Sequence, residues 1–241
     1  MPESRRRSES LFRHEQGSYK MNRCIIFDLD GTLIDSMADI ALATNRMRHC
    51  FNRPPLPEQT IIGYVGHGIG LLAKCAIADA PEVPPEQAKE ELLRAYRENP
   101  VVHTTLYPGV KDGIRILKTA GFQLAVASNK PFELCLPILT KLGVAESFDA
   151  IIGGEKSIRK KPDPDMLQYA LKETKSAPEH SWMFGDSNPD MQAGKAAGCK
   201  TAYAAYGYGK PEQNSWDFKA ECFLDFVWHV LKNGSGNESR P

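Results

Sequence analysis

The sequence predicts an α/β fold: a doubly wound, Rossmann-like parallel sheet with an all-helical domain inserted after its first strand. From residue 105 onward, short apolar runs alternate with helical patterns, which is typical of repeated β-α-β units. Residues 36–104 break this rhythm and carry only helical patterns. The apolar runs of the core do not alternate with polar residues. Strands buried on both faces of a covered parallel sheet have this pattern.

The elements of the core follow in chain order. The first expected strand is Cys24 to Phe27, an apolar run that leads directly into two aspartates. Several of the expected helices end at glycine, the residue favoured just after a helix C-terminus. The later strands are expected at 122–128, 148–154, 181–186 and 200–206, and the helices at 109–121, 131–143, 163–174, 188–198 and 222–232.

The inserted segment contains three helical patterns separated by proline clusters, at 37–51, 56–80 and 84–99, and residues 60–65 within it fit either a helix or a strand. The polar ends of the chain do not carry enough apolar residues to order themselves. The predicted domains are an extension at 1–20 and a tail at 233–241, both disordered, a catalytic core at 21–35 and 105–232, and a helical cap at 36–104.

The composition narrows the classes of partner. Lysine plus arginine and aspartate plus glutamate both number 30, so the net charge is zero and no basic surface for nucleic acid is expected. No apolar stretch reaches the roughly 18 residues that a membrane span requires. The six cysteines form no CxxC pair, and most lie in apolar segments. Buried free thiols in a reducing cytoplasm are therefore expected, and the sequence leaves monomer and homodimer open.

Polar side chains follow the strands at the edge where a doubly wound sheet binds its ligands. The first strand leads to Asp28 and Asp30, and the second to Ser128, Asn129 and then Lys130. Lys160 and Lys161 precede a later helix, and Asp186 and Asp190 follow the fourth strand. Acidic, hydroxyl, amide and cationic groups are thus expected to meet at one edge.

Such a group of carboxylates would repel itself unless it held a cation. A cluster of oxygen ligands without Cys or His favours Mg²⁺ over zinc. A Mg²⁺ held by few carboxylates usually also engages a substrate phosphate, and lysine, serine and asparagine donors can hold the remaining phosphate oxygens. The sequence therefore predicts phosphoryl chemistry, with Asn129 among the groups that bind the substrate.

The D-x-D spacing allows two different roles. Gly31 follows at once, so the backbone is expected to turn just after the strand. Asp28 can then attack phosphorus as a carboxylate nucleophile. Asp30 can protonate the leaving oxygen and later activate water. One carboxylate must be ionised and the other protonatable, which different environments can achieve.

Four segments, FDLDGTLIDS, VASNK, KKPDP and GDSNPDM, resemble in order and spacing the four motifs of the haloacid dehalogenase superfamily, over nearly all of residues 21–210. The resemblance implies that Asp28 forms an aspartyl-phosphate and that Asp30 is the acid/base. It also implies that Ser128 supplies the motif-two hydroxyl and that Lys161 is the motif-three lysine. The dehalogenases proper lack the second aspartate, so Asp30 favours the phosphatase branch.

The resemblance also implies a metal site and a cap. Mg²⁺ would be held by Asp28, the backbone carbonyl of Asp30, and Asp186, and Asp190 matches a further acidic position that often lies behind the direct ligands. The inserted helices resemble a cap that closes over the site. GYVGHGIGLL at 63–72, together with LYPGV and YGYG, resembles phosphoglycolate phosphatases. On this basis Gly66, His67 and Gly68 are expected to approach the substrate.

The expected function is therefore Mg²⁺-dependent hydrolysis of a small phosphate monoester, 2-phosphoglycolate, through an aspartyl-phosphate. Three alternatives stay open. The substrate could be a nucleotide, pyrophosphate or a sugar phosphate. The protein could be a mutase similar to β-phosphoglucomutase, in which the phosphoenzyme survives while the product reorients. It could also be a catalytically silent binding protein on the same fold, although the intact motif residues argue against this.

Overall fold

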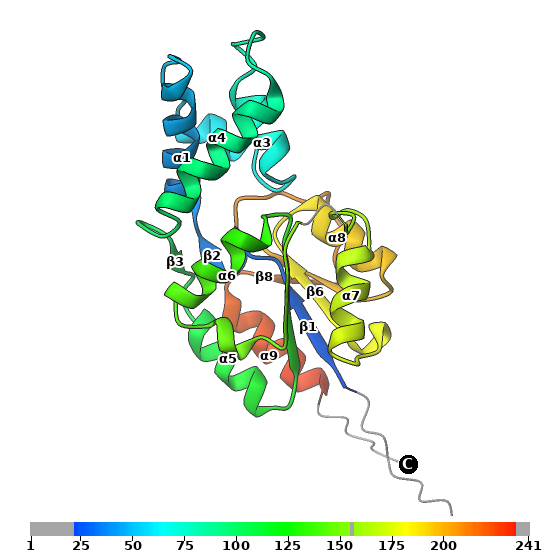
Figure 1. The fold of residues 1–241 in the computed structure, drawn as a ribbon. Coiled ribbons are helices and arrows are strands. Elements are labelled where there is room, and N and C mark those ends of the chain that lie inside the picture. The colour runs from blue at the N-terminus through cyan, green and yellow to red at the C-terminus, as the bar shows by residue number, and fades with distance from the viewer. Residues whose placement is uncertain (1–21, 155–156, 235–241) are drawn as a thin grey trace, which may run out of the picture.

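The computed structural model describes residues 22–154 and 157–234, which form a core with a helical cap above it (Figure 1). The predictions for the extension at 1–20 and for residues 235–241 of the predicted tail at 233–241 lie outside the described residues. Within the described part, the core sheet has six parallel strands in the order β5-β4-β1-β6-β7-β8. These strands are β1 (Cys24–Phe27), β4 (Gln123–Ala127), β5 (Ala150–Ile152), β6 (Trp182–Gly185), β7 (Lys200–Ala204) and β8 (Phe218–Ala220). The predicted doubly wound parallel sheet is confirmed.

The position of β1 determines where ligands can bind. The next core strands after β1, β4 and β5, are added on one side of it. The chain then crosses to the other side of β1, where β6, β7 and β8 are added in turn. β1 and its two neighbours therefore lie where the order of the strands reverses. In open α/β sheets the crevice beyond the carboxyl ends of such strands is the usual ligand site.

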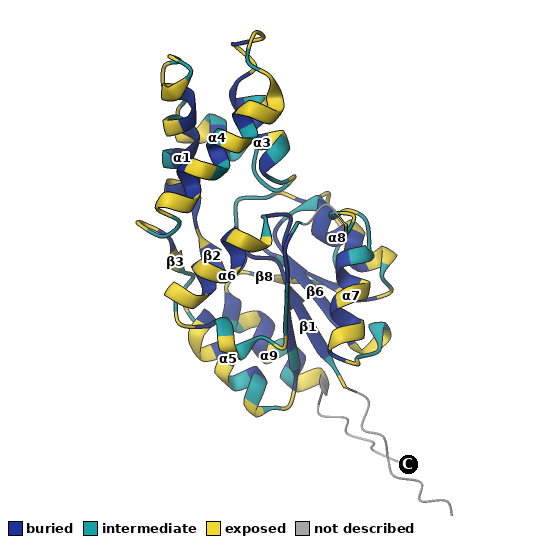
Figure 2. Cartoon of the chain, viewed as in Figure 1, coloured by how far each residue is buried: buried dark blue, intermediate teal, exposed yellow. Residues whose placement is uncertain are grey.

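Helices cover both faces of the sheet. On one face, alternate strand residues such as Ile26 and Met183 pack against α7 and α8. On the other face, Phe27 and Phe184 pack with α9, and α5 packs against α9. Figure 2 shows the strands buried between helices whose outer sides are exposed. The core helices are α5 (Val110–Thr119), α6 (Phe132–Lys141), α7 (Asp165–Glu173), α8 (Asn188–Ala196) and α9 (Phe223–Gly234), and the short 3-10 helices are η1 (Ala145–Ser147) and η2 (Pro178–His180).

The cap consists of helices that lie within the predicted segment 36–104. The predicted helix at 56–80 is divided, because the glycine-rich residues 63–68 form a turn in its middle. Two cap helices, α1 and α4, pack against each other, and α3 packs on α4. The cap helices are α1 (Met37–Cys50), α2 (Glu58–Ile62), α3 (Ile69–Ala76) and α4 (Pro85–Glu98).

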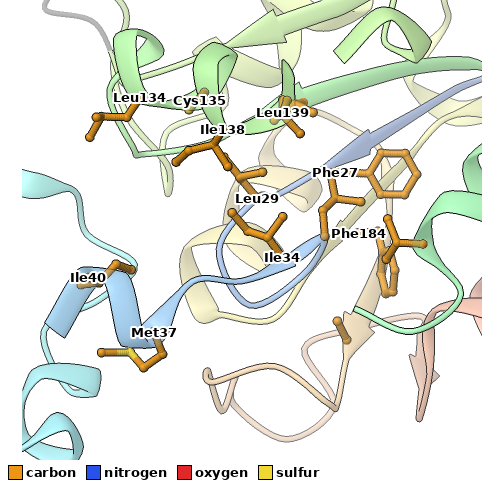
Figure 3. Packing of buried hydrophobic residues seen from close by; sticks show 14 of the residues in the cluster. Phe27, Leu29, Ile34, Met37, Ile40, Leu134, Cys135, Ile138, Leu139 and Phe184 are labelled. Atoms are coloured by element: carbon orange, nitrogen blue, oxygen red, sulfur yellow. The ribbon is translucent and has the colours of Figure 1, made fainter. Parts of the chain in front are cut away.

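A two-strand ribbon joins the cap to the core. β2 (Ile34–Asp35) and β3 (Thr105–Leu106) pair antiparallel, with Asp35 opposite Thr105, so the chain enters and leaves the cap at one place. The apolar core is continuous through this point: Leu29, Ile34, Met37 and Ile40 run from the sheet toward α1 (Figure 3).

Asp39 ties the two connecting segments together. It lies in the first turn of α1, is 1% exposed, and accepts hydrogen bonds from the backbone N–H groups of Val102, His103 and Thr104 and from the Thr104 hydroxyl. Burial opposes the ionised form of Asp39, but the Thr104 hydroxyl and the backbone donors outweigh it and lower its pKa. The charged carboxylate thus stabilises the junction between cap and core.

Several details differ from the predicted elements. The short edge strand β8 and the ribbon strands β2 and β3 were not predicted, and α9 extends to Gly234, two residues beyond the predicted end of the core. All six cysteines are free thiols, but only Cys24, Cys135 and Cys199 are buried as expected; Cys50 and Cys222 are exposed. Among the described residues, no helix has both the length and the apolar character needed to cross a membrane.

Candidate active site

Asp28 lies directly after β1, at the centre of the sheet edge. Its backbone N–H donates to the carbonyl of Phe184 on β6 at 2.9 Å, so strand pairing fixes its position. Its side chain meets Lys161, whose Nζ lies 2.8 Å from Asp28 Oδ1. The lysine also donates to the Ala127 carbonyl at 2.6 Å and pairs with Asp190 Oδ1 at 2.7 Å. One buried ammonium thus links the ends of three core segments.

Asp186 follows β6 and faces the same space. Its Oδ2 accepts the backbone N–H groups of Tyr208 and Gly209 at 2.9 and 2.8 Å. Gly31 explains how the carboxylate comes so close to the D-x-D turn: its φ is +81°, and a Cβ there would lie 2.2 Å from Asp186 Oδ2. A glycine is therefore required at position 31 both for the turn and for the approach.

The three carboxylates form a cluster suited to a cation. One oxygen from each of Asp28, Asp186 and Asp190 lies within 4.8 Å of the others, and all three residues are buried. Burial raises the pKa of Asp28 to about 6, although Lys161 opposes this change. Burial and the neighbouring carboxylates raise the pKa of Asp186 well above its usual value. The ionised cluster therefore needs positive charge beyond Lys161, and its oxygen donors fit Mg²⁺.

Asp190 differs from the other two because both of its oxygens already have partners. Oδ2 accepts the backbone N–H and the hydroxyl of Ser187 at 3.0 and 2.6 Å and thereby caps α8, and Oδ1 pairs with Lys161. It is fully buried. The geometry therefore suits Asp190 for holding Lys161 in place.

Asp30 points away from this cluster into a second ionic group. Lys130 Nζ lies 2.8 and 3.0 Å from its two carboxylate oxygens, and the Ser36 hydroxyl donates to Oδ1 at 2.5 Å. The same ammonium donates to the hydroxyl of Tyr96, on cap helix α4, at 2.9 Å. Asp28 and Asp30 are thus paired with different lysines, so the two carboxylates lie in different environments.

Ser128 and Asn129 follow β4 and are 2% and 4% exposed. The amide of Asn129 donates to the carbonyls of Gly66 in the cap and Lys161 in the core, both at 2.9 Å, while its buried Oδ1 has no hydrogen-bond partner among the described residues. Asn129 therefore connects the cap loop to the core loop that carries Lys161.

The three predicted cap residues are placed differently from one another. Gly66 contacts Asn129 through its carbonyl. Gly68 has φ +88°, and a Cβ there would lie 3.0 Å from both the Asn129 carbonyl oxygen and Lys160 Nζ. The His67 side chain is exposed and does not line the cavity described next.

A cavity of about 50 Å³ lies between cap and core. Asp28, Asp30, Ser128 and Lys130 of the core line it, together with Tyr96 of the cap. The cap contributes apolar side chains and the backbone of Gly66 and Gly68. A space of this volume favours a small group beside the reacting atoms.

Tyr96, Ser36 and Tyr208 were not among the predicted site residues. Lys130 was expected at the sheet edge because it follows Asn129 in the VASNK segment, but it was given no role in the site. Tyr96 carried no such signal, because it occupies an ordinary buried position of an amphipathic helix. Tyr208 belongs to the YGYG segment, and its hydroxyl lies 2.6 Å from the backbone nitrogen of Ser36.

Comparisons with known proteins agree with this geometry. The family of haloacid dehalogenase-like hydrolases matches residues 25–204. A phosphoglycolate phosphatase from Aquifex aeolicus is 39% identical over 85% of this chain and 95% of its own, and one from Chromobacterium violaceum is 34% identical over 88% and 97%. The crystal structure of a predicted phosphoglycolate phosphatase from Haemophilus somnus has a TM-score of 0.81 and 31% identity over 87% and 98%. The chain belongs to the haloacid dehalogenase-like hydrolase family.

Proposed function

We propose that this hydrolase is a Mg²⁺-dependent phosphatase that acts on a small phosphate monoester, 2-phosphoglycolate, through an aspartyl-phosphate at Asp28. The main support is the buried arrangement of Asp28 and Lys161 beside the Asp186 carboxylate at the switch point of the sheet. The phosphatase names of relatives that match nearly the full chain support the reaction class.

Asp28, the backbone carbonyl of Asp30, and Asp186 are the groups proposed to hold Mg²⁺. The bound ion would neutralise the carboxylates and offset charge on the transferring phosphoryl group. Lys161 would hold a phosphoryl oxygen while remaining paired with Asp190. The hydroxyl and backbone N–H groups after β4, around Ser128, would hold the others.

The reaction proceeds in two displacements. In the first, Asp28 Oδ attacks phosphorus, the P–O bond to the alcohol breaks, and protonated Asp30 gives its proton to the leaving oxygen. In the second, Asp30 takes a proton from water, the water oxygen attacks phosphorus, and the bond to Asp28 breaks to release inorganic phosphate. Asp30 ends protonated, as it began.

The cavity favours a small substrate. Drug-sized ligands occupy pockets of about 300–1,000 Å³, whereas this space measures about 50 Å³. A two-carbon acid beside the phosphate suits such a space better than a nucleoside.

The test is a panel of phosphate esters with and without Mg²⁺, assayed on the wild type and on Asp28→Asn. We expect 2-phosphoglycolate to give the highest kcat/KM, EDTA to abolish turnover, and Asp28→Asn to be inactive. An Asp28→Asn protein that retains appreciable activity would refute the nucleophile. A wild type that prefers nucleotides or sugar phosphates would refute the substrate, and one inert toward every ester would refute the phosphatase itself.

A further inference from the structure

The hydrogen bonds of Lys130 form a closed set that spans the two domains. An ammonium has three N–H donors, and three acceptors lie within reach: the two oxygens of Asp30 at 2.8 and 3.0 Å and the Tyr96 hydroxyl at 2.9 Å. Lys130 is 7% exposed and Tyr96 is 3% exposed. Because an unpaired buried charge is costly, the orientation of Lys130 depends on both partners being present.

The three residues come from three separate parts of the fold. Asp30 follows β1, Lys130 follows β4, and Tyr96 lies near the end of cap helix α4. The ammonium also lies 4.5 Å from the centroid of the Tyr96 ring, so the phenol contacts it through both its hydroxyl and its face. Tyr96 can occupy this place only when the cap lies against the core.

The bonds point to a consequence for Asp30. The Ser36 hydroxyl, at the start of α1, donates to Oδ1 of this carboxylate, and Lys130 donates to both of its oxygens. Burial raises the pKa of Tyr96 to about 12, so the phenol is neutral and accepts from the ammonium. If Tyr96 withdrew, the third N–H of Lys130 would lose its acceptor and the ammonium could turn toward other oxygens, including those at Asp28.

We propose that Tyr96 and Lys130 are positioning residues through which the closed cap orients the Asp30 carboxylate for proton transfer. This inference rests on the proposed role of Asp30 as the acid/base. Tyr96 fixes Lys130, and Lys130 fixes Asp30. With the cap open the chain of contacts is broken, so proton transfer is efficient only when substrate is enclosed. The cap then contributes to catalysis as well as to selection.

The kinetic test uses Tyr96→Phe, which removes one oxygen and keeps the ring, assayed on three esters. 2-Phosphoglycolate and ethyl phosphate have leaving groups that need a proton, and only the first has a carboxylate. p-Nitrophenyl phosphate has a leaving group that needs none. Tyr169→Phe, at an exposed position on core helix α7, is the matched control.

We expect Tyr96→Phe to lower kcat on both alkyl esters by a similar factor, on the order of tenfold to a hundredfold, since loss of positioning forfeits part of the acid/base contribution. With p-nitrophenyl phosphate, the rate of the nitrophenol burst should equal that of the wild type while steady-state turnover falls. The reason is that only the hydrolysis of the aspartyl-phosphate then requires Asp30.

Three kinetic results would overturn the proposal. An unchanged kcat on the alkyl esters would show that the hydroxyl is dispensable. A loss confined to 2-phosphoglycolate would assign Tyr96 and Lys130 to the substrate carboxylate instead. A burst slowed by the same factor as turnover would show general distortion of the site.

A second measurement does not depend on activity. Urea midpoints of Tyr96→Phe, Lys130→Met and the double variant form a thermodynamic cycle. We expect the double variant to lose clearly less than the sum of the two single losses, and additive losses would overturn the contact. If the wild type hydrolysed none of the esters, the proposed phosphatase and the proton-transfer role would both fall, whereas additivity in an active enzyme would refute the coupling alone.

Discussion

The Asp39 junction offers the sharpest test of how the cap is held. Replacing Asp39 with Asn keeps the size of the side chain and removes its charge. A hydrogen bond to a charged group contributes about 1.5–3 kcal/mol net, and one between neutral groups about 0.5–1.5 kcal/mol. Each hydrogen bond to residue 39 should therefore contribute about 1 kcal/mol less when its acceptor is the neutral amide. Three of the bonds to Asp39 measure 2.9 Å or less, those from the N–H groups of Val102 and Thr104 and from the Thr104 hydroxyl. The expected loss of unfolding free energy is therefore about 3 kcal/mol.

For a chain of this size, 3 kcal/mol corresponds to a drop in Tm of about 6–12 °C. Calorimetry with urea unfolding measures it, and amide exchange at Val102 to Thr104 should quicken. The control is Asp112→Asn, whose carboxylate is also in a first helical turn but is exposed. An Asp39→Asn shift no larger than that of the control would refute the reasoning.

The sign of the pH dependence is a further check on Asp39. Its folded pKa is lowered, so its contribution is present above the unfolded value of about 4 and disappears as the pH falls through the lower folded value. The difference in Tm between wild type and Asp39→Asn should therefore be full at neutral pH and shrink below about pH 4. A difference that stayed constant into that range would show that charge is not its source.

Three further outcomes are expected. The folded pKa of Asp28 is about 6, above its unfolded value, so the Tm of the metal-free protein should rise as the pH falls from 7 toward 5. Mg²⁺ should therefore raise the Tm more at pH 7 than at pH 5, and an equal increase at both pH values would contradict this. Gly31→Ala should fold less stably and bind Mg²⁺ weakly by calorimetric titration, because its Cβ would meet Asp186. Arg48→Lys should lower the urea-measured stability by about 2 kcal/mol, because lysine cannot reproduce the paired bonds to Asp79; an unchanged midpoint would count against that account.

The sheet was predictable because its strands carry their signal locally. Uninterrupted apolar runs followed by helical patterns indicate buried parallel strands without knowledge of partners. β8 was not predicted because Phe218–Ala220 is a three-residue edge strand with an exposed lysine at its centre. β2 and β3 have two residues each and exist only because the cap brings their ends together.

The candidate site likewise contains residues that the sequence could predict and residues that it could not. Asp28, Asp30, Ser128 and Asp186 follow strands, so topology alone brings them to one edge. Tyr96 does not follow a strand. Its position depends on how cap helix α4 packs over the core, and no local sequence pattern encodes that packing. The distinction between the two lysine environments likewise arises from tertiary packing, which sets the pairs Lys161 with Asp28 and Lys130 with Asp30.

The ribbon between Asp35 and Thr105 makes the cap an exchangeable module. Its two ends lie opposite each other in one antiparallel pair, so a segment of any length could be inserted there without stretching the core. New substrates could thus be acquired by replacing the cap alone. A graft would nevertheless have to supply a hydroxyl where Tyr96 now meets Lys130. The replaceable cap therefore carries one atom that the core requires, the hydroxyl oxygen of Tyr96. That requirement limits which caps this core can accept.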